Sequence, residues 1–231
     1  MKMKKILHKL KPYKHGCIPI LYGIFYLICF FYLEQRPVEK FHMIHAGIDD
    51  RIPFCEVFII PYYLWFVYIA LSVAAFVFFD KEKKDFWKLC IALGFGMTFF
   101  LVFSYVYPNA LQLRPDSFAR DNIFVTLVKG IYASDTSTNV FPSIHCYNSM
   151  VVNVALCHSR QFKQYKGITI SSNILCILII LSTVFVKQHS VIDVIGAFVM
   201  FLPFYFVLYF YPALKEKRAL STVNIAEGTL S

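Results

Sequence analysis

The sequence predicts an all-α membrane protein, a bundle of six transmembrane helices in a single membrane domain covering residues 1–231. Three observations support this fold class. The chain is 58% hydrophobic and 18% aromatic, which leaves too little polar surface to cover a soluble fold. Six segments carry almost no charge, and most approach the roughly 20 residues that a helix needs to cross a bilayer. Basic residues also concentrate in alternate connections between those segments.

The six segments follow one another without an internal repeat. The first comes after a basic stretch, as a signal peptide would, but its far end reads FFYLEQRP and lacks a small-residue cleavage site, so we expect a retained anchor. The fourth is short and the sixth contains Asp193, so these two assignments depend on the other four. The predicted spans are residues 17–33, 57–79, 89–107, 143–157, 168–186 and 191–211.

Two connections are longer than turns. The first, 34–56, contains FHMIHAGIDDR, in which His42 and His45 are more typical of an exposed or interfacial surface than of a metal pair. The second, the external loop 109–141, contains ARDNIFVTLVKGIY, whose apolar residues recur at helical spacing. We expect a short helix there, either in the outer interface or packed as a cap on the bundle. The recurring residues are Ile123, Phe124, Leu127, Val128, Ile131 and Tyr132.

The net charge of +9 does not indicate a nucleic-acid partner, because the charge follows the connections. The N-terminal segment, the second and fourth connections and the C-terminal tail hold 16 of the 23 Lys and Arg residues. The positive-inside rule then places both termini in the cytoplasm. We expect an integral protein of the plasma membrane with its other end on the extracytoplasmic side. The seven scattered cysteines indicate buried thiols, not a disulfide framework or a metal site.

Polar side chains gather at the predicted extracytoplasmic ends of spans three to six. In NVFPSIHCYNSM, Pro142 suits the start of a helix, whose first N–H groups are available to an anion. His145, Ser149 and Asn153 are spaced by four and so share one helix face. In lipid, that face must turn toward the bundle interior or a wet cavity.

A second polar pair lies in VKQHSVIDVIGAF, where His189 and Asp193 are one helical turn apart. A carboxylate there can accept Nδ1–H and leave Nε2 as a base or nucleophile. Two other interpretations stay open, a structural pair that joins helices and a proton relay in a transporter. Gly196 and Ala197 continue the same side with small residues that permit close helix contact.

In chain order these pieces resemble the type 2 phosphatidic acid phosphatase and vanadium haloperoxidase superfamily, over about residues 113–198. The family motifs are K-x6-R-P, P-S-G-H and S-R-x5-H-x3-D. Three family positions differ here, with Tyr107 in the lysine position, Ile144 in the glycine position and Thr183 in the arginine position. The matching residues are Arg114, Pro115, Pro142, Ser143, His145, Ser182, His189 and Asp193.

The resemblance implies an integral membrane lipid phosphatase that hydrolyses a phosphomonoester or a diphosphate of a lipid through a phosphohistidine, with no metal or other cofactor. His189 would be the nucleophile, Asp193 would orient it, and His145 would act as acid and then as base. Lys187 and Arg120 would replace the family's lysine and arginine, which are absent here. The phosphate-binding candidates are Arg114, Ser143, Lys187 and Arg120.

Two alternatives to hydrolysis remain open. A retained His, His, Asp set with altered cations also resembles the sphingomyelin and inositol phosphorylceramide synthase branch, which transfers a lipid headgroup to an alcohol. The chain could instead be a catalytically degenerate membrane protein that binds lipid phosphate. The expected partners are a lipid phosphate or phospholipid substrate and the bilayer, without nucleic acid. The sequence predicts neither the lipid nor the oligomeric state.

Overall fold

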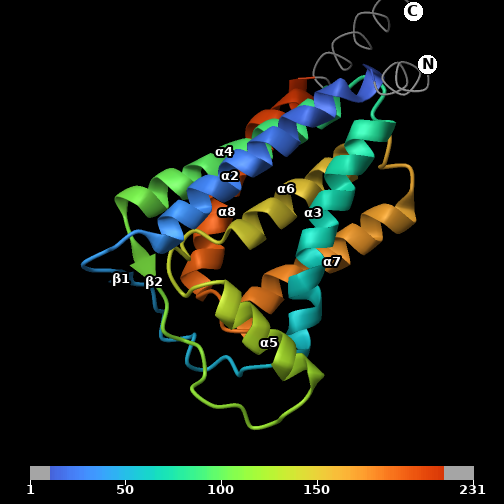
Figure 1. The fold of residues 1–231 in the computed structure, drawn as a ribbon. Helices are drawn as coiled ribbons and strands as arrows, with labels where there is room; N and C mark the ends of the chain where they lie inside the picture. The colour runs from blue at the N-terminus through green and yellow to red at the C-terminus, as the bar shows by residue number, and fades with distance from the viewer. Residues whose placement is uncertain (1–10, 216–231) are drawn as a thin grey trace, which may run out of the picture.

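A computed structural model describes residues 11–215, which fold into a bundle of helices with one very small sheet (Figure 1). Short turns of 3₁₀ or π helix extend three of the helices, namely η1 (Lys11–Gly16) before α2, η2 (Glu56–Phe58) before α3 and η3 (Phe206–Phe210) after α8. The α-helices are α2 (Cys17–Gln35), α3 (Ile59–Phe79), α4 (Lys84–Val106), α5 (Ile123–Ser134), α6 (Ile144–His158), α7 (Lys166–Phe185) and α8 (Val191–Tyr205).

Five helical segments of the described chain are long and apolar enough to cross a membrane. They are Lys11–Gln35, Glu56–Phe79, Lys84–Val106, Lys166–Phe185 and Val191–Lys215. The all-α, membrane-type prediction is therefore confirmed, whereas the number six is not. The predicted span 143–157 became α6, whose 15 residues are too few for a segment that crosses hydrocarbon by itself.

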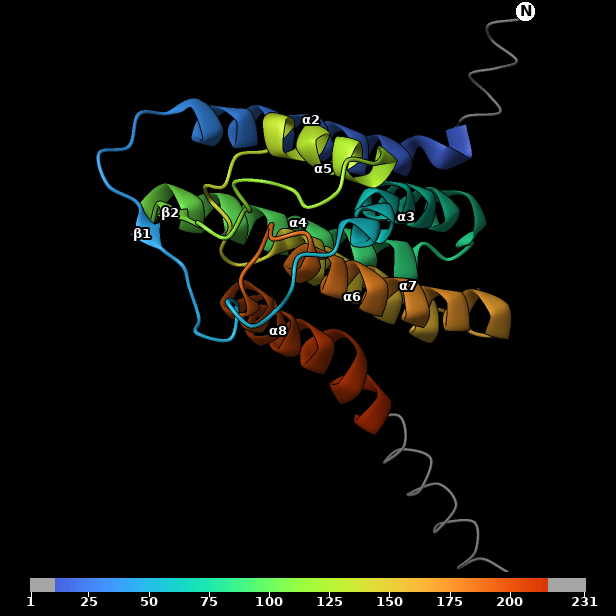
Figure 2. The ribbon, with the colours of Figure 1, turned by 90° about the horizontal axis from the view of Figure 1, so that it is seen from below.

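Helix α6 is short because its surroundings are protein. It packs against α3, α4, α7 and α8, and ten of its 15 residues are buried. In the view of Figure 2, α4, α6 and α7 lie between α2 on one side and α8 on the other. A helix enclosed in this way does not need an apolar surface as long as the bilayer is thick. It can therefore carry polar residues that a lipid-facing helix could not.

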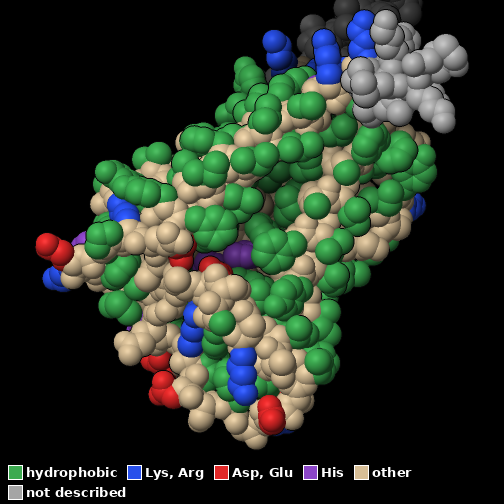
Figure 3. All heavy atoms as spheres, viewed as in Figure 1, with side chains coloured by type: hydrophobic (Ala, Val, Ile, Leu, Met, Phe, Trp, Pro, Cys, Tyr) green, Lys and Arg blue, Asp and Glu red, His purple; other side chains and the backbone are tan. Residues whose placement is uncertain are grey.

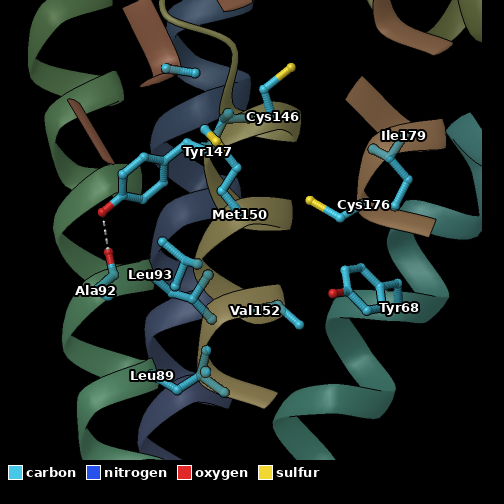
Figure 4. Packing of buried hydrophobic residues seen from close by; sticks show 14 of the residues in the cluster. Tyr68, Leu89, Ala92, Leu93, Cys146, Tyr147, Met150, Val152, Cys176 and Ile179 are labelled. Atoms are coloured by element: carbon cyan, nitrogen blue, oxygen red, sulfur yellow. Dashed lines mark hydrogen bonds between the residues drawn. The ribbon is translucent and has the colours of Figure 1, made fainter. Parts of the chain in front are cut away.

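The packing of α4 against α6 depends on one glycine. The hydroxyl of Tyr147 in α6 donates to the carbonyl of Ala92 in α4 at 2.9 Å (Figure 4). A Cβ atom at Gly96 would overlap the ring of Tyr147, so only glycine allows α4 this close. Figure 4 also shows Met150 and Val152 of α6 among buried side chains that include Leu93, Cys176 and Tyr68.

The polar face predicted for α6 turns inward, and its groups are paired. Asn153 Oδ1 accepts from the hydroxyl of Ser172 in α7 at 2.7 Å, and Tyr68 of α3 is hydrogen-bonded to the same hydroxyl at 2.6 Å. Ser149 Oγ donates to the carbonyl of His145 at 2.7 Å. These bonds link three helices where water is scarce, and they leave His145 as the residue of this face that is turned toward a cavity.

The described chain begins and ends at the same end of the bundle (Figure 1). There Tyr13 packs edge-on against Phe78, and Lys88 lies over the ring of Tyr209. The opposite end holds the long connections, which are joined by parallel pairing of β1 (His42–Met43) with β2 (Asn109–Ala110). The orientation prediction also depends on residues outside the described part of the chain: Lys2, Lys4, Lys5, Lys9, Lys217 and Arg218.

A short helix, α5, forms within the loop 109–141 where helical spacing predicted one, and it packs on the bundle. Asn122 caps it by accepting the N–H of Val125 at 3.0 Å. Val125, Val128 and Ile131 are buried, and Val128 and Ile131 form a cluster with Ile59, Tyr62 and Val186. Packing as a cap therefore accounts for its buried face. Its exposed face includes Ile123, and a position in the membrane interface stays a prediction.

Candidate active site

The first turn of α8 positions a histidine and a carboxylate. Ser190 caps the helix, and Asp193 Oδ2 accepts the Ser190 N–H at 2.8 Å to complete a capping box. The same oxygen lies 3.2 Å from Nδ1 of His189. Both side chains are buried, with Asp193 fully inaccessible. The cap that starts the helix therefore also sets the orientation of His189.

The next contact reaches α6, because His189 Nε2 lies 3.4 Å from His145 Nδ1. Asp193 is acceptor-only when ionised, so the proton of a neutral His189 is on Nδ1 and its Nε2 presents a lone pair. The proton between the two rings then belongs to His145 Nδ1. The three side chains form one hydrogen-bonded row in which a nitrogen with a free lone pair faces an N–H donor.

Backbone bonds hold the two helix starts together. Ser143 N–H donates to the carbonyl of Asp193 at 3.1 Å, and His189 N–H donates to the carbonyl of Thr183 at 3.0 Å. Ser143 is the N-cap of α6, with its Oγ accepting the N–H of Cys146 at 3.4 Å. Helix α6 thus begins at Ile144, two residues after Pro142. Ser143 is fully buried as a cap and does not line the cavity described next.

A cavity of about 270 Å³ lies against the two histidines. Its walls come from α2, α3, α6, the end of α5, the loop that follows α5 and the loop between α7 and α8. Its mouth includes Leu27, Phe31 and Phe66, each about half exposed. Figure 3 shows histidine and acidic side chains at the bottom of a hollow rimmed by hydrophobic ones. The polar or charged side chains that line it are Ser134, Asp135, Thr136, Thr138, Asn139, His145, Gln188 and His189.

Gln188 brings an amide to this cavity. Its side chain is buried, its Oε1 accepts from Arg114 Nη2 at 2.6 Å, and its Nε2 is buried without a partner. Arg114 is held further by the carbonyls of Asp135 and Tyr132 and lies over the Tyr132 ring, 4.4 Å from its centroid. Burial lowers the pKa of Arg114. Arg114 does not line the cavity but lies behind Gln188 and orients its amide.

Asp135 adds a carboxylate to the same cavity. Burial raises the pKa of this carboxyl group, and the hydroxyl of Tyr62 donates to its Oδ2 at 3.4 Å. Tyr62 and Trp65 also pack on the ring of His145, with centroids 4.8 Å and 4.3 Å away. The indole N–H of Trp65 is buried without a partner. One aromatic wall therefore connects His145 to Asp135.

The other two candidate cations lie elsewhere. Lys187 has a left-handed backbone, φ 56°, and its Nζ donates to the carbonyls of Asp49 at 2.7 Å and Ile52 at 2.6 Å. Arg120 is 76% exposed and pairs with Glu56 at 3.3 Å. The expectation that they replace the missing family cations does not agree with the structure, because backbone carbonyls and Glu56 bind them away from the cavity.

The three residues that differ from the family motifs are all uncharged. Tyr107 stacks on His42 with centroids 4.0 Å apart, Thr183 Oγ1 donates to the carbonyl of Ile180, and Ile144 lines the cavity. In the described part of the chain, no group of three or more His, Cys, Asp or Glu residues is arranged to bind a metal.

Sequence reasoning missed several residues of the cavity. Gln188 carried one usable signal, its position next to His189. Asp135, Tyr62 and Trp65 carried none, because a loop and a distant helix bring them to His145 only in the folded chain.

Comparison with known proteins gives a match to the family model described as the PAP2 superfamily, over residues 85–217. This range is more than half of the chain and includes His145, His189 and Asp193. No curated protein matches, and no solved structure matches.

Proposed function

Because the chain belongs to the PAP2 superfamily, whose members are phosphatases and phosphotransferases, we propose that it transfers the phosphoryl group of a lipid phosphate ester through a phosphohistidine at His189. The observation that carries this proposal is the row Asp193–His189–His145 at the base of a cavity with a hydrophobic mouth. Hydrolysis of a phosphomonoester or diphosphate is the simplest reaction of this kind.

In the first step, the lone pair of His189 Nε2 attacks phosphorus and forms an N–P bond. The P–O bond to the lipid breaks, and its electron pair stays on the lipid oxygen. That oxygen takes a proton from His145, whose imidazolium form is favoured by the anionic phosphate beside it. Asp193 stabilises the positive charge that develops on His189.

In the second step, the oxygen of water or of an alcohol attacks phosphorus and gives its proton to His145. The N–P bond breaks and its electron pair returns to His189 Nε2. For either step the phosphoryl group must enter between His189 Nε2 and His145 Nδ1, which are now 3.4 Å apart. Substrate binding therefore separates the two rings and replaces their mutual contact.

The lipid would reach the histidines from the side. Helix α2 packs on α4, and α3 packs on α6 and α7, so the cavity between α2 and α3 is walled by side chains of both helices. The half-exposed Leu27, Phe31 and Phe66 suit contact with acyl chains. A phospholipid could place its phosphate at His189 while its tails stay in the bilayer.

A phosphotransferase that moves a headgroup to an alcohol is the second candidate. The observation in its favour is the charge of the cavity. The Asp135 carboxylate lines it, and no Lys or Arg is among the described residues that do. A site that releases a phosphate dianion by hydrolysis usually surrounds it with cations.

The test of the proposed function is His189→Ala in purified full-length protein. Incubation with lipid phosphates and phospholipids, with and without diacylglycerol or ceramide, should give His189-dependent phosphate release or headgroup transfer. Turnover should fall by roughly 10³-fold or more, together with any acid-labile phosphoenzyme. His158→Ala is the matched control, because His158 lies at the opposite end of α6 and bonds only a backbone carbonyl. Turnover that survives in His189→Ala would contradict the nucleophile assignment.

A further inference from the structure

The cavity at the histidines is acidic where a phosphate site is expected to be basic. No Lys or Arg is among the described residues that line it, whereas Asp135 is. A phosphomonoester carries nearly two negative charges, and placing it beside a half-buried carboxylate costs free energy. A phosphodiester carries one negative charge and is easier to accommodate. A phosphodiester with a cationic headgroup would be attracted by the same carboxylate.

Aromatic rings line the cavity together with this carboxylate. The hydroxyl of Tyr62 reaches Asp135 Oδ2 at 3.4 Å, and the indole of Trp65 lies beside the ring of His145. Tyr26 and Phe30 of α2 line the same space. The faces of Trp and Tyr rings attract cations, and a carboxylate among them strengthens that attraction. Such a combination of groups suits an alkylammonium ion.

We propose that Asp135, Tyr62 and Trp65 bind the ammonium group of a zwitterionic phospholipid, so that the substrate is a choline or ethanolamine phosphodiester. The inference rests on the proposed function, because it uses the same cavity and places the phosphodiester at His189. It adds the headgroup, which the family membership does not specify.

The positions of the groups agree with such a headgroup. Tyr62 contacts both the His145 ring and the Asp135 carboxylate, so one tyrosine ring separates the phosphate end of the cavity from the ammonium end. In these headgroups a two-carbon bridge joins phosphate to ammonium, and its length is similar to that of the Tyr62 ring. At the phosphate end, the unpartnered Nε2 of the buried Gln188 is a neutral donor suited to a monoanionic oxygen.

The raised pKa of Asp135 supports the same assignment. Burial disfavours the ionised carboxylate, with a smaller contribution from Glu34, and outweighs the opposing effects of His189, Arg114 and Tyr62 on its pKa. An alkylammonium ion held against Asp135 adds an opposite charge on the cavity side and stabilises the ionised form. A phosphate oxygen in its place would do the reverse.

The reaction of such a substrate follows the two steps given above. The bond that breaks is the one between phosphorus and the glycerol oxygen, which leaves as diacylglycerol with a proton from His145. The headgroup phosphate is then bound to His189 Nε2 and passes to an alcohol or to water, whose proton goes to His145. No redox step or additional reactant is needed.

The first experiment compares four lipids with identical tails in the purified full-length protein: phosphatidylcholine, phosphatidylethanolamine, phosphatidylglycerol and phosphatidate. We expect the two zwitterionic lipids to be turned over with kcat/KM at least about 10-fold above the two anionic ones. A difference between choline and ethanolamine identifies which ammonium the cavity prefers. Preference for phosphatidate or phosphatidylglycerol would overturn the inference and leave the proposed function in place.

The second experiment uses Asp135→Asn with Asp121→Asn as the matched control, because Asp121 is 91% exposed on the same end of the bundle. Asp135→Asn should raise KM for the zwitterionic lipids by about 10-fold or more and should leave or raise turnover of phosphatidylglycerol. An equal loss on every lipid would show that Asp135 supports the fold or the chemistry, and would overturn the inference.

A binding measurement separates the inference from the proposed function. In Trp87→Phe protein, Trp65 is the remaining tryptophan, since the chain has two. Phosphocholine should change its fluorescence with a saturation curve that weakens about 10-fold or more in Asp135→Asn. Saturable, Asp135-dependent binding without turnover of any lipid would support the inference and refute the proposed function. Turnover of phospholipids without Asp135-dependent binding of phosphocholine would support the proposed function and overturn the inference.

Discussion

Gln188 and Arg114 share the phosphate-binding role that the family resemblance assigns to Arg114. Arg114 Nη2 donates to Gln188 Oε1 at 2.6 Å and to the Asp135 carbonyl at 2.8 Å, so its fork is used within the protein. Gln188 lines the cavity, and its Nε2 is buried without a partner. We infer that Gln188 contacts the phosphate and that Arg114 is a positioning residue that orients and polarises it.

Replacing Gln188 tests this division. Gln188→Ala removes the donor and should lower kcat/KM by about 10²-fold, as loss of one preorganised donor does in other enzymes. Gln188→Glu keeps an acceptor for Arg114 but presents a negative oxygen to the phosphate, so it should lower kcat/KM further than Gln188→Ala does. Steady-state kinetics of both variants, with the exposed Gln164→Ala as control, provide the measurement. A Gln188→Ala enzyme within threefold of the wild type would show that Gln188 makes no contact with substrate.

Single residues were predictable where a motif fixes their spacing. His189 and Asp193 were expected one turn apart on a helix and do meet, but His189 lies before the N-cap Ser190, and Asp193 in the first turn of α8 reaches back to it. Lys187 was expected at the phosphate from its place two residues before His189, but its left-handed backbone allows no periodic extrapolation, and its ammonium binds carbonyls of another loop. Asp135 was not predictable, since no spacing relates it to His145.

At the scale of elements, the first long connection acts as a brace for α8. Asp49 is completely buried, and its carboxylate accepts from Ser190 Oγ at 2.6 Å, Val191 N–H at 2.9 Å and Ala46 N–H at 2.8 Å. Asp49 thus caps α8, the helix that carries Asp193 and begins two residues after His189. A residue of a distant loop thereby helps to fix the row Asp193–His189–His145.

Asp49→Ala should destabilise the protein, because it leaves buried donors at Ser190 and Val191 without a partner. Loss of such a cap costs about 1–2 kcal/mol, which should appear as a lower midpoint of thermal inactivation in detergent. The neighbouring Asp50→Ala is the matched control, since Asp50 makes only an exposed pair with His45. Equal midpoints for the two variants would mean that the loop does not stabilise α8.

Most elements could be predicted from the sequence, since long apolar segments have few alternatives to a helix in lipid. Helix α6 was placed correctly but could not be separated from a complete span, because hydropathy does not reveal which neighbours enclose a helix. The two-residue pairing of β1 with β2 gave no signal either, since it depends on two loops meeting in the folded chain.

At the scale of the whole molecule, the two ends of the bundle differ in chemistry. The cavity, α5 and the long connections share one end, and the described part of the chain begins and ends at the other (Figure 1). The distribution of Lys and Arg predicts that the cavity end is extracytoplasmic.

Cysteine labelling in intact cells tests this orientation. In protein without its seven native cysteines, Asp121→Cys at the cavity end should react with a membrane-impermeant maleimide in intact cells. Glu82→Cys, in the connection between α3 and α4, should react only after permeabilisation. Both positions are well exposed, so a difference reports the side of the membrane and not burial. The reverse pattern would invert the predicted topology.

The opening of the cavity between α2 and α3 has a consequence for the membrane itself. By the proposed route, a lipid that enters sideways at one end of the bundle and leaves the same way would stay in its leaflet. Under the proposed reaction, only one monolayer would exchange bulky headgroups for small hydroxyl-ended lipids, while the other would keep its composition. The two monolayers would then differ in preferred area, and the bilayer would tend to curve until lipid flip-flop restored the balance.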